Sequence, residues 1–385
     1  MFKIGILTFH YSNNYGGVLQ ALSLQKSIES MEYDVEIINY IPSSYEPTKI
    51  KNNLGLSKNI FKNRLKDMNI IYISKKISIM KKNSDRITDK FNIFRKKEMK
   101  LSKQVDENSL ITILNDYDAI VVGSDQVWNP SQRKRMEYFL NFGDSFQGKK
   151  ISYAADSTIK EINSDDMDRL KKALNDFSFI SVRNEHTFDF VKSIIKKETT
   201  IVADPTIIYN FGYDNIDIGT KKDYILTYIL GKEIKGTHAK ALEKVKKIYG
   251  DLPVYSIKIP TMNFELSSYA DKVFYDLDPI EWLSMFRNAK FIYTDSFHGV
   301  LFSLKYHKPF LAYHTEKMRA TRFIDLGKRY EVDRYIVQNV AEIDKKDSLG
   351  IKPDFKTIDN ILEKQKHYSF EFLETALKES NSKKE

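Results

Sequence analysis

One histidine of this chain stands where a reactive side chain would be expected. His298 follows the apolar run Phe291 to Thr294 and begins a second apolar run of helical periodicity, within the sequence Thr-Asp-Ser-Phe-His-Gly. The N-terminus of a helix favours the neutral imidazole, which can exchange a proton with a substrate. Most single histidines are structural, but this position leads us to predict that His298 is catalytic, with Asp295 as its orienting partner.

Three further loops follow strand-like runs and carry polar side chains, at residues 10–17, 123–130 and 181–187. The first contains Gly16 and Gly17 at the predicted start of a helix, where free backbone N–H groups attract anions. Its spacing matches neither a dinucleotide-binding motif nor a P-loop, so the two glycines could equally serve a tight turn.

The second loop is rich in the residue types that bind carbohydrate. An aromatic face packs on a sugar ring, and amides or carboxylates bond neighbouring hydroxyls. The residues concerned are Ser124, Asp125, Gln126, Trp128 and Asn129. The alternative is structural, because Trp128 could belong to the core while Ser124 or Asp125 caps a helix.

The third loop contains Arg183, directly after the apolar run Phe179 to Val182. A guanidinium at the edge of a sheet can hold a carboxylate or a phosphate with two parallel hydrogen bonds. An internal ion pair with Glu185 or Asp204 explains the same residue equally well.

These loops need a scaffold of parallel strands, and the order of apolar runs predicts one. Strand-like runs alternate with helical segments along the chain, and the irregular stretch 210–222 separates two such series. We predict an α/β fold of two Rossmann-like lobes facing a cleft, residues 1–209 and 210–350. Residues 351–385 would form a helix that packs back on the first lobe, followed by a polar tail. Ligands of such sheets bind beyond the carboxyl ends of the strands, where the four loops lie.

The composition is that of a soluble protein, with 42% apolar residues and no apolar run long enough to span a membrane. The N-terminus has neither the basic start nor the cleavage site of a signal peptide, so we expect a cytoplasmic protein. The chain has no cysteine, which excludes disulfides and thiolate metal sites. No cluster of ligand residues in the sequence indicates a metal.

Positive charge is concentrated in a predicted helical insert at about residues 48–104, with 17 Lys or Arg against 4 Asp or Glu. Charge confined to one segment favours a local contact with something anionic over a nucleic-acid-binding surface. The insert also has apolar residues at rough helical spacing, namely Leu54, Ile60, Phe61, Leu65, Met68 and Ile71. It is either a basic amphipathic helix for an anionic membrane surface or a solvated face or lid, and solvated faces are the more common.

Six segments, taken in order, resemble the polysaccharide pyruvyl transferase family: GILTFH with NYGGVLQA, VVGSDQVWN, SYAA, SVR, VADPT, and TDSFHG with a following KPF. The resemblance spans residues 3–327 and depends on the order of the segments. One departure is the second glycine of NYGG, where relatives often carry alanine or aspartate. The resemblance implies a GT-B-like fold and transfer of an enolpyruvyl-derived unit from phosphoenolpyruvate to a sugar. The product would be a cyclic pyruvate ketal on a cell-surface polysaccharide or its lipid-linked precursor, with release of phosphate.

The resemblance also implies roles for individual residues. Arg183 and Arg322 would bind the carboxylate and phosphate of the donor, and His298 would transfer a proton. The other predicted donor-site residues are Ser296, Gly299, Gly16 and Gly17, and Asn14 joins the acceptor-binding residues of loop 123–130. No cofactor besides the donor substrate is implied. The expected partners are a sugar, oligosaccharide or lipid-linked acceptor and the anionic inner face of a membrane.

Two other functions fit the same fold. A nucleotide-sugar glycosyltransferase would place a carboxylate for the donor ribose in the second lobe, where Glu281 is the candidate. Pro279, two residues earlier, indicates instead that Glu281 belongs to the start of a helix. A non-catalytic carbohydrate-binding scaffold could keep the fold alone, although His298, Arg183 and Arg322 together argue against it.

Overall fold

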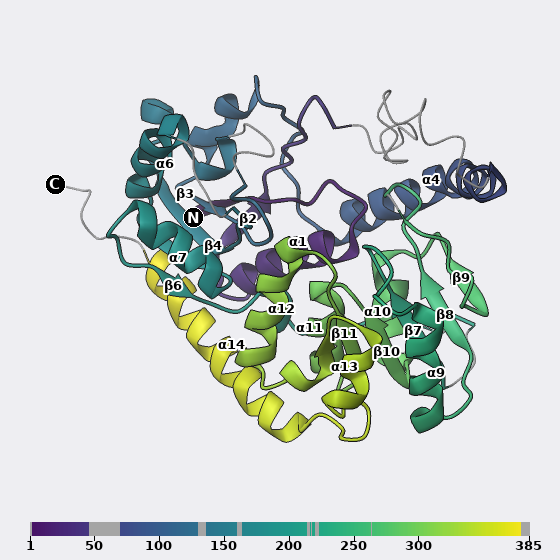
Figure 1. The fold of residues 1–385 in the computed structure, drawn as a ribbon. Helices are drawn as coiled ribbons and strands as arrows, with labels where there is room; N and C mark the ends of the chain where they lie inside the picture. The colour runs from purple at the N-terminus through teal and green to yellow at the C-terminus, as the bar shows by residue number, and fades with distance from the viewer. Residues whose placement is uncertain are drawn as a thin grey trace.

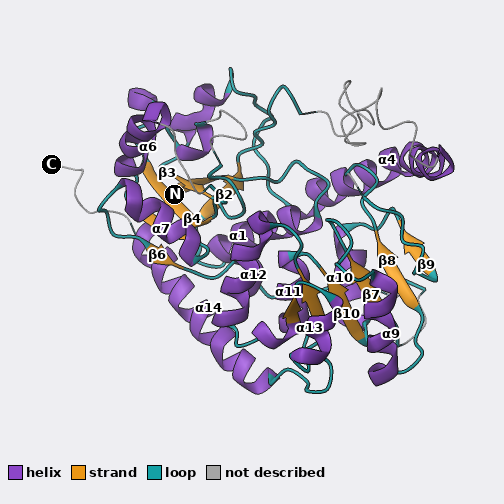
Figure 2. Cartoon of the chain, viewed as in Figure 1, coloured by secondary structure: helices purple, strands orange, loops and turns teal. Residues whose placement is uncertain are grey.

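The chain is described by a computed structural model at residues 2–45, 70–129, 136–159, 164–213, 216, 218–219, 223–262 and 264–378. Within these residues it forms two six-stranded sheets in which every pair of neighbouring strands is parallel. Helices surround both sheets (Figures 1 and 2). The predicted class, an α/β fold with two Rossmann-like lobes, is confirmed.

The first sheet comes from the N-terminal half of the chain. In order across the sheet, its strands are β2 (Asp34–Ile37), β1 (Lys3–Leu7), β3 (Ala119–Val122), β4 (Lys149–Ala155), β5 (Phe179–Val182) and β6 (Thr200–Ile201). All four residues of β3 are buried, as expected for a central strand covered on both faces. The helices of this half are α1 (Tyr15–Glu29), α4 (Ile70–Glu98), α6 (Ser164–Asp176), α7 (Glu185–Ile194) and α8 (Pro205–Ile208). Short 3-10 turns lie at Leu110–Asp116, Glu137–Phe139 and Gly143–Ser145.

The second sheet has the same construction. Its strands in order are β12 (Ile336–Val337), β11 (Phe310–Tyr313), β10 (Phe291–Thr294), β7 (Ile225–Tyr228), β8 (Val254–Ile257) and β9 (Lys272–Phe274). The helices are α9 (His238–Tyr249), α10 (Pro279–Asn288), α11 (Phe297–Lys305), α12 (Lys317–Arg329) and α13 (Val340–Lys345), and a 3-10 turn lies at Asp333–Tyr335. The sequence did not predict the edge strands β9 and β12, which have only three and two residues.

The C-terminal helix α14 (Phe355–Leu377) contacts both halves of the chain. The Tyr330 hydroxyl donates to Oε1 of Gln365 on this helix at 2.8 Å, and the backbone N–H of Ala203 donates to Oγ of Ser369 at 3.0 Å. In Figure 1 the helix runs from the second sheet toward the edge of the first. The prediction that this helix packs back on the first lobe is confirmed.

The two halves share hydrophobic packing where α1 begins. Tyr15, on α1, stacks on Trp282 of α10 with ring centroids 5.5 Å apart, and its hydroxyl donates to the carbonyl oxygen of Leu277 at 2.8 Å. Tyr15 and Trp282 are both fully buried. The first turn of α1 is therefore fixed against the second lobe, which determines what its glycines can touch.

Helix α4 forms most of the described part of the predicted basic insert. Arg86 and Lys90 of α4 form ion pairs of 2.7 and 2.8 Å with Asp276 and Glu281 of the second lobe. Part of the positive charge thus meets carboxylates of the same chain. Of the apolar residues noted at rough helical spacing, only Ile71 is described, with 75% of its surface exposed. The others, Leu54, Ile60, Phe61, Leu65 and Met68, lie outside the described residues.

Candidate active site

Loops after strands of both sheets meet at one place. In chain order, Asp125 follows β3, Asp156 follows β4, Arg183 follows β5, Asp204 follows β6, and His298 follows β10 in the first turn of α11. The carboxyl ends of parallel strands lie at one edge of each sheet, which brings these side chains together although they are far apart in sequence.

Arg183 lies at the centre of this group and is only 1% exposed. Its Nη1 donates to Oδ2 of Asp204 at 2.9 Å, its Nη2 donates to Asp156, and Asp125 lies 3.6 Å from the same nitrogen. The ring of Phe297 faces the guanidinium at 4.3 Å. The sequence left two interpretations of Arg183 open, a ligand-binding guanidinium and an internal ion pair. The structure contains the internal ion pair with Asp204. The two terminal nitrogens of the guanidinium are engaged with the chain itself, so Arg183 is not an open clamp for a donor.

The buried carboxylates around Arg183 are held in their ionised form. Burial alone would raise the pKa of Asp204, but the neighbouring His298 and Arg183 outweigh burial and keep that pKa well below its usual value. The pKa of Asp156 is also lowered, because Arg183 and Arg322 together outweigh the effect of its burial. These negative charges in turn raise the pKa of Arg183 despite its own burial.

His298 is paired with a carboxylate from the other sheet. Its Nε2 lies 3.5 Å from Oδ2 of Asp204, and the residue is 8% exposed. Ser296 caps α11 by accepting from the backbone N–H of Gly299 at 3.2 Å, which fixes the first turn that carries His298. A carboxylate at this distance can orient the imidazole ring, so His298 and Asp204 form a pair suited to proton transfer.

Asp295 does not have the partner that the sequence suggested. Its two carboxylate oxygens accept from the backbone N–H groups of Leu230 and Gly231, at 2.6 and 2.7 Å. It therefore positions the loop after β7, while the carboxylate beside His298 is Asp204. The prediction of Asp295 as orienting residue needs this correction, because the two lobes bring Asp204 to His298 from 94 positions away in the sequence.

The glycines of the predicted donor site have different surroundings. A Cβ on Gly16 would lie 2.1 Å from Nδ1 of His298, whereas a Cβ on Gly17 would meet nothing closer than a carbonyl oxygen at 3.4 Å. The N–H of Gly17 donates to Oδ1 of Asn14, the N-cap of α1, at 3.2 Å. Gly299 fits against Thr294, whose Oγ1 would lie 2.4 Å from an added Cβ. Gly16 and Gly299 thus permit close packing around His298.

The predicted carbohydrate loop is largely structural. Trp128 is fully buried, stacks on Phe139 with centroids 5.5 Å apart, and donates from Nε1 to the carbonyl oxygen of Tyr138 at 2.9 Å. The structural alternative therefore holds for Trp128, which is a core residue and not a platform for a sugar.

Two further members of the loop are also buried. Ser124 donates to the Ala154 carbonyl oxygen at 2.9 Å, and Asn129 accepts from the backbone N–H of Thr158 at 2.9 Å. Of the predicted acceptor residues, Asp125, Gln126 and Asn14 are partly exposed.

Asp156 and Lys258 escaped the sequence analysis, whereas Arg322 was predicted. Asp156 was not considered, and Asp204 was considered only as a partner for Arg183. Arg322, on α12, is partly exposed and lies close enough to Asp156 to lower the pKa of that carboxyl, as noted above. Lys258, which directly follows β8, is 3% exposed and donates to the carbonyl oxygen of Ile229 at 3.4 Å. A polar residue directly after an apolar strand was the available signal for Asp156 and Lys258.

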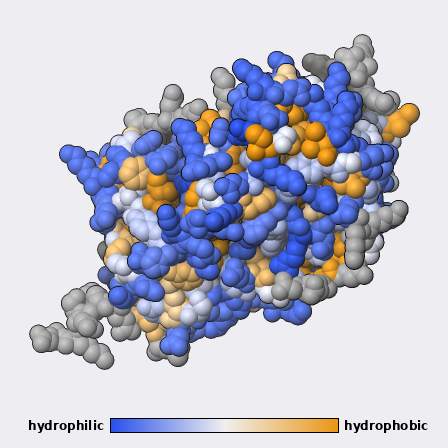
Figure 3. Space-filling model, turned by 90° about the horizontal axis from the view of Figure 1, so that it is seen from below, coloured by the Kyte–Doolittle hydropathy of each residue, from blue (hydrophilic) through white to orange (hydrophobic). Residues whose placement is uncertain are grey.

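Within the described parts of the chain, no group of three or more His, Asp or Glu side chains has an arrangement that could hold a metal ion. Among the same residues, no helix has both the length and the apolar character needed to cross a membrane. The molecular face seen in Figure 3 is mostly hydrophilic, with hydrophobic side chains scattered between charged ones.

Comparison with solved structures finds a similar fold in proteins of low sequence identity. Arabidopsis thaliana UGT89C1 superposes with a TM-score of 0.54 and 12% identity, covering 97% of this chain and 99% of that one. Its complex with UDP-L-rhamnose gives 0.53 and 12%, with 97% and 98% covered. The UDP-GlcNAc 2-epimerase of Methanocaldococcus jannaschii gives 0.46 and 14%, with 95% and 99% covered. The search of curated proteins found no match.

The fold and the site thus define a two-lobed enzyme-like protein with a buried charge cluster where the sheets meet. The family model described as polysaccharide pyruvyl transferase matches residues 14–314. This range includes Gly16, Arg183, Asp204 and His298. The chain belongs to the polysaccharide pyruvyl transferase family.

Proposed function

We propose that this protein transfers a pyruvyl unit from phosphoenolpyruvate to a sugar of a cell-surface polysaccharide or its lipid-linked precursor. Family membership supports a transferase of this kind. The observation that carries the proposal is the pairing of His298 with ionised Asp204 between two lobes, with Arg322 near the neighbouring Asp156.

In the proposed reaction two hydroxyls of the acceptor add to the second carbon of phosphoenolpyruvate. A proton adds to its methylene carbon, which becomes the methyl group, and the carbon–oxygen bond to phosphate breaks. The two hydroxyl protons are lost, one in balance with the proton gained by the methylene carbon and the other with the departing phosphate. His298, polarised by Asp204, is the group that transfers one of these protons.

The donor has a carboxylate and a phosphate, so its site needs positive charge. We assign this role to Arg322, which is partly exposed, and to the N-terminal turns of α1 and α11, where Gly16, Gly17 and Ser296 lie. Arg183 becomes a positioning residue, because it holds Asp156 and Asp204 in place. The partly exposed side chains of Asn14, Asp125 and Gln126 remain candidates for contact with acceptor hydroxyls.

The proposal includes no cofactor, because phosphoenolpyruvate itself supplies the transferred group. It also places the protein in the cytoplasm, with the basic insert at the anionic inner face of the membrane where a lipid-linked acceptor would be available. The support for this location is the charge of the insert, 17 basic against 4 acidic residues.

The test is phosphate release from phosphoenolpyruvate with a panel of oligosaccharide and lipid-linked acceptors. We expect His298→Ala and Asp204→Asn each to lower turnover by about a hundredfold or more, the usual scale for loss of a general acid or base. Circular dichroism would show whether both variants remain folded. Turnover near the wild-type value in folded His298→Ala would remove this residue from the mechanism.

Ligand-induced stabilisation separates this function from its main alternative. Phosphoenolpyruvate should raise the melting temperature of a pyruvyl transferase, whereas UDP or GDP should raise that of a nucleotide-sugar glycosyltransferase. Glu281, the candidate ribose ligand of the alternative, instead closes a capping box with Asp278 at the start of α10 and pairs with Lys90. The structure therefore gives the glycosyltransferase no specific support beyond its fold.

A further inference from the structure

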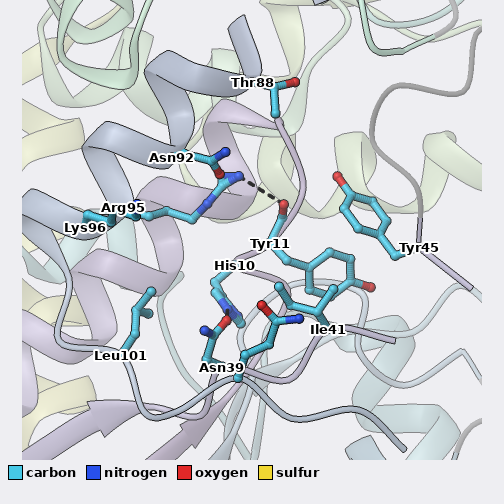
Figure 4. Close-up of a pocket in the computed structure, with 11 residues that line it drawn as sticks. His10, Tyr11, Asn39, Ile41, Tyr45, Thr88, Asn92, Arg95, Lys96 and Leu101 are labelled. Carbon is cyan, nitrogen blue, oxygen red and sulfur yellow. Dashed lines mark hydrogen bonds between the residues drawn. The ribbon is translucent and has the colours of Figure 1, made fainter. Parts of the chain in front are cut away.

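A cavity of about 370 Å³ lies in the first lobe, apart from the charge cluster around Arg183. It is bounded by the chain that follows β1 and β2 and by the C-terminal half of α4 (Figure 4). Its lining includes Tyr11, Asn39, Tyr45, Asn92 and Arg95. No part of the mechanism above uses these residues.

Arg95 is a buried cation in the wall of this cavity. The residue is 8% exposed, and its Nη2 donates to the Tyr11 carbonyl oxygen at 3.1 Å and to Oδ1 of Asn13 at 3.2 Å. Figure 4 shows the first of these bonds, with the guanidinium directed toward the space between Asn92 and Tyr11. Its Nη1 is buried without a hydrogen-bond partner. Among the described residues no carboxylate forms an ion pair with Arg95.

This arrangement is costly unless a ligand completes it. A buried charge without a counter-charge loses its hydration and gains little in return, whereas Arg183 has three carboxylates around it. Burial lowers the pKa of Arg95 to about 10, so the guanidinium still carries its charge at neutral pH. A carboxylate or phosphate entering the cavity would supply both the missing acceptor for Nη1 and the missing negative charge.

The remaining lining has the residue types that contact sugars. The rings of Tyr11 and Tyr45 lie edge to face with centroids 4.6 Å apart; Tyr11 is buried and Tyr45 is partly exposed. Asn92 is exposed at the cavity, whereas Oδ1 of Asn39 lies 3.0 Å from Nε2 of His10 and the Thr88 hydroxyl donates to the Ser84 carbonyl oxygen. Aromatic rings pack on the apolar faces of a sugar, and amides bond its hydroxyls. An inorganic anion bound at Arg95 would use neither the Tyr45 ring nor the Asn92 amide.

One loop connects the cavity to the candidate active site. Residues 10–17 begin with His10 and Tyr11 in the cavity wall and end with Gly16 packed against His298. Asn13, between them, donates from Nδ2 to Oγ1 of Thr88 at 2.8 Å and so fixes the loop to α4. Asn13 and Tyr15 of this loop are buried, so the loop links the cavity wall to the residue packed on His298 through the chain itself.

We propose that this cavity binds the acceptor through a negatively charged group, a carboxylate or a phosphate, carried by a saccharide whose ring packs on the partly exposed Tyr45. That the bound saccharide is the acceptor rests on the proposed function. The binding itself requires neither phosphoenolpyruvate nor turnover. It defines the acceptor as an acidic or phosphorylated saccharide.

The test is calorimetric titration of the whole protein, without phosphoenolpyruvate, using glucose 1-phosphate, glucuronic acid, glucose and inorganic phosphate. We expect one or both anionic sugars to bind at least about tenfold more tightly than glucose or inorganic phosphate. The stronger of the two anionic sugars identifies phosphate or carboxylate as the recognised group. Equal binding of glucose overturns the role of charge, and equal binding of inorganic phosphate overturns the role of the sugar.

Two variants tie the binding to Arg95. Arg95→Gln removes the cation, and Asn92→Asp places a carboxylate one helical turn away at an exposed position, where it can pair with Arg95 and repel an anion. Both should weaken binding of the anionic sugar about tenfold or more. Asn92→Asp keeps the test valid if Arg95→Gln fails to fold, because an exposed substitution leaves the core unchanged.

The matched control is Lys97→Gln, which removes one positive charge from the same helix at a side chain that is 73% exposed and outside the cavity. It should bind the anionic sugar as the wild type does. An equal loss in Lys97→Gln and Arg95→Gln would overturn the proposed site in favour of general attraction to a basic surface. His298→Ala should bind as the wild type does, so that failure of pyruvyl transfer and failure of this site remain distinguishable.

Discussion

Substitution of Gly16 by alanine tests the geometry of the candidate active site most directly. The added Cβ would lie 2.1 Å from Nδ1, 2.5 Å from Cγ and 2.8 Å from Cε1 of His298. Tyr15 stacks on Trp282 beside it and prevents a simple retreat of α1. The imidazole must therefore move by about 1 Å or more to restore ordinary contact distances.

This movement should cost turnover without costing the fold. His298 already lies 3.5 Å from Asp204, and a displacement of about 1 Å in a catalytic group lowers rates by about a hundredfold. We expect kcat for phosphate release at saturating phosphoenolpyruvate to fall by that factor. Gly16 has an ordinary backbone φ, so the alanine adds no backbone strain of its own.

Gly17→Ala is the matched control, because it adds the same methyl group to the next residue of the same helix turn. Its Cβ would lie 3.4 Å from the Phe9 carbonyl oxygen and 3.7 Å from Oδ2 of Asp125, which are tolerable contacts. Alanine keeps the backbone N–H that Gly17 contributes to this turn, so we expect near-normal kcat at saturating phosphoenolpyruvate and, from helix propensity, up to about 1 kcal/mol of added stability. Equal kcat values for Gly16→Ala and Gly17→Ala would refute the assignment of His298 as a group held in place by Gly16.

Three further outcomes are expected. Trp128→Ala should lower the free energy of unfolding in urea by about 3–5 kcal/mol, as expected for a fully buried tryptophan, and unchanged stability would restore its role as a sugar platform. Burial lowers the pKa of Lys258 to about 8, so the folded state binds fewer protons than the unfolded state, and stability should rise between about pH 8 and pH 10.5. In urea unfolding at each pH, Lys258→Met should lose this rise and gain up to about 3 kcal/mol of stability at pH 7. A pH profile like that of the wild type in this variant would show that Lys258 is not the cause of the rise. Co-sedimentation should show binding to anionic but not neutral vesicles, lost at high salt, and failure with both would leave the basic insert as a lid or solvated face.

The sequence predicted the scaffold well because its signals are local. The apolar runs Phe179–Val182 and Phe291–Thr294 coincide with β5 and β10, and the polar loop after each run could be identified without knowledge of the fold. The placement of His298 in the first turn of a helix after a strand follows from this spacing. The strand β9, with three residues and partial exposure, has no such signal.

The partners within the site were not predictable in the same way. Asp204 reaches His298 only because α11 of one lobe and the loop after β6 of the other are packed together, and no periodicity encodes that contact. The immediate neighbour Asp295 was the natural guess, but its carboxylate is used by backbone groups. Trp128 shows a second limit of prediction from sequence. A tryptophan serves equally well in a hydrophobic core and as a platform for a sugar ring, so the residue type alone cannot distinguish the two roles.

The C-terminal helix α14 has a consequence for how the protein unfolds. At a rise of about 1.5 Å per residue its 23 residues span about 34 Å, enough to reach from one sheet to the other. Leu362 and Leu373 of this helix are buried in the hydrophobic cluster that includes residues of both sheets. Neither lobe can complete that cluster while the other is unfolded, so the last segment of the chain joins the lobes into one cooperative unit.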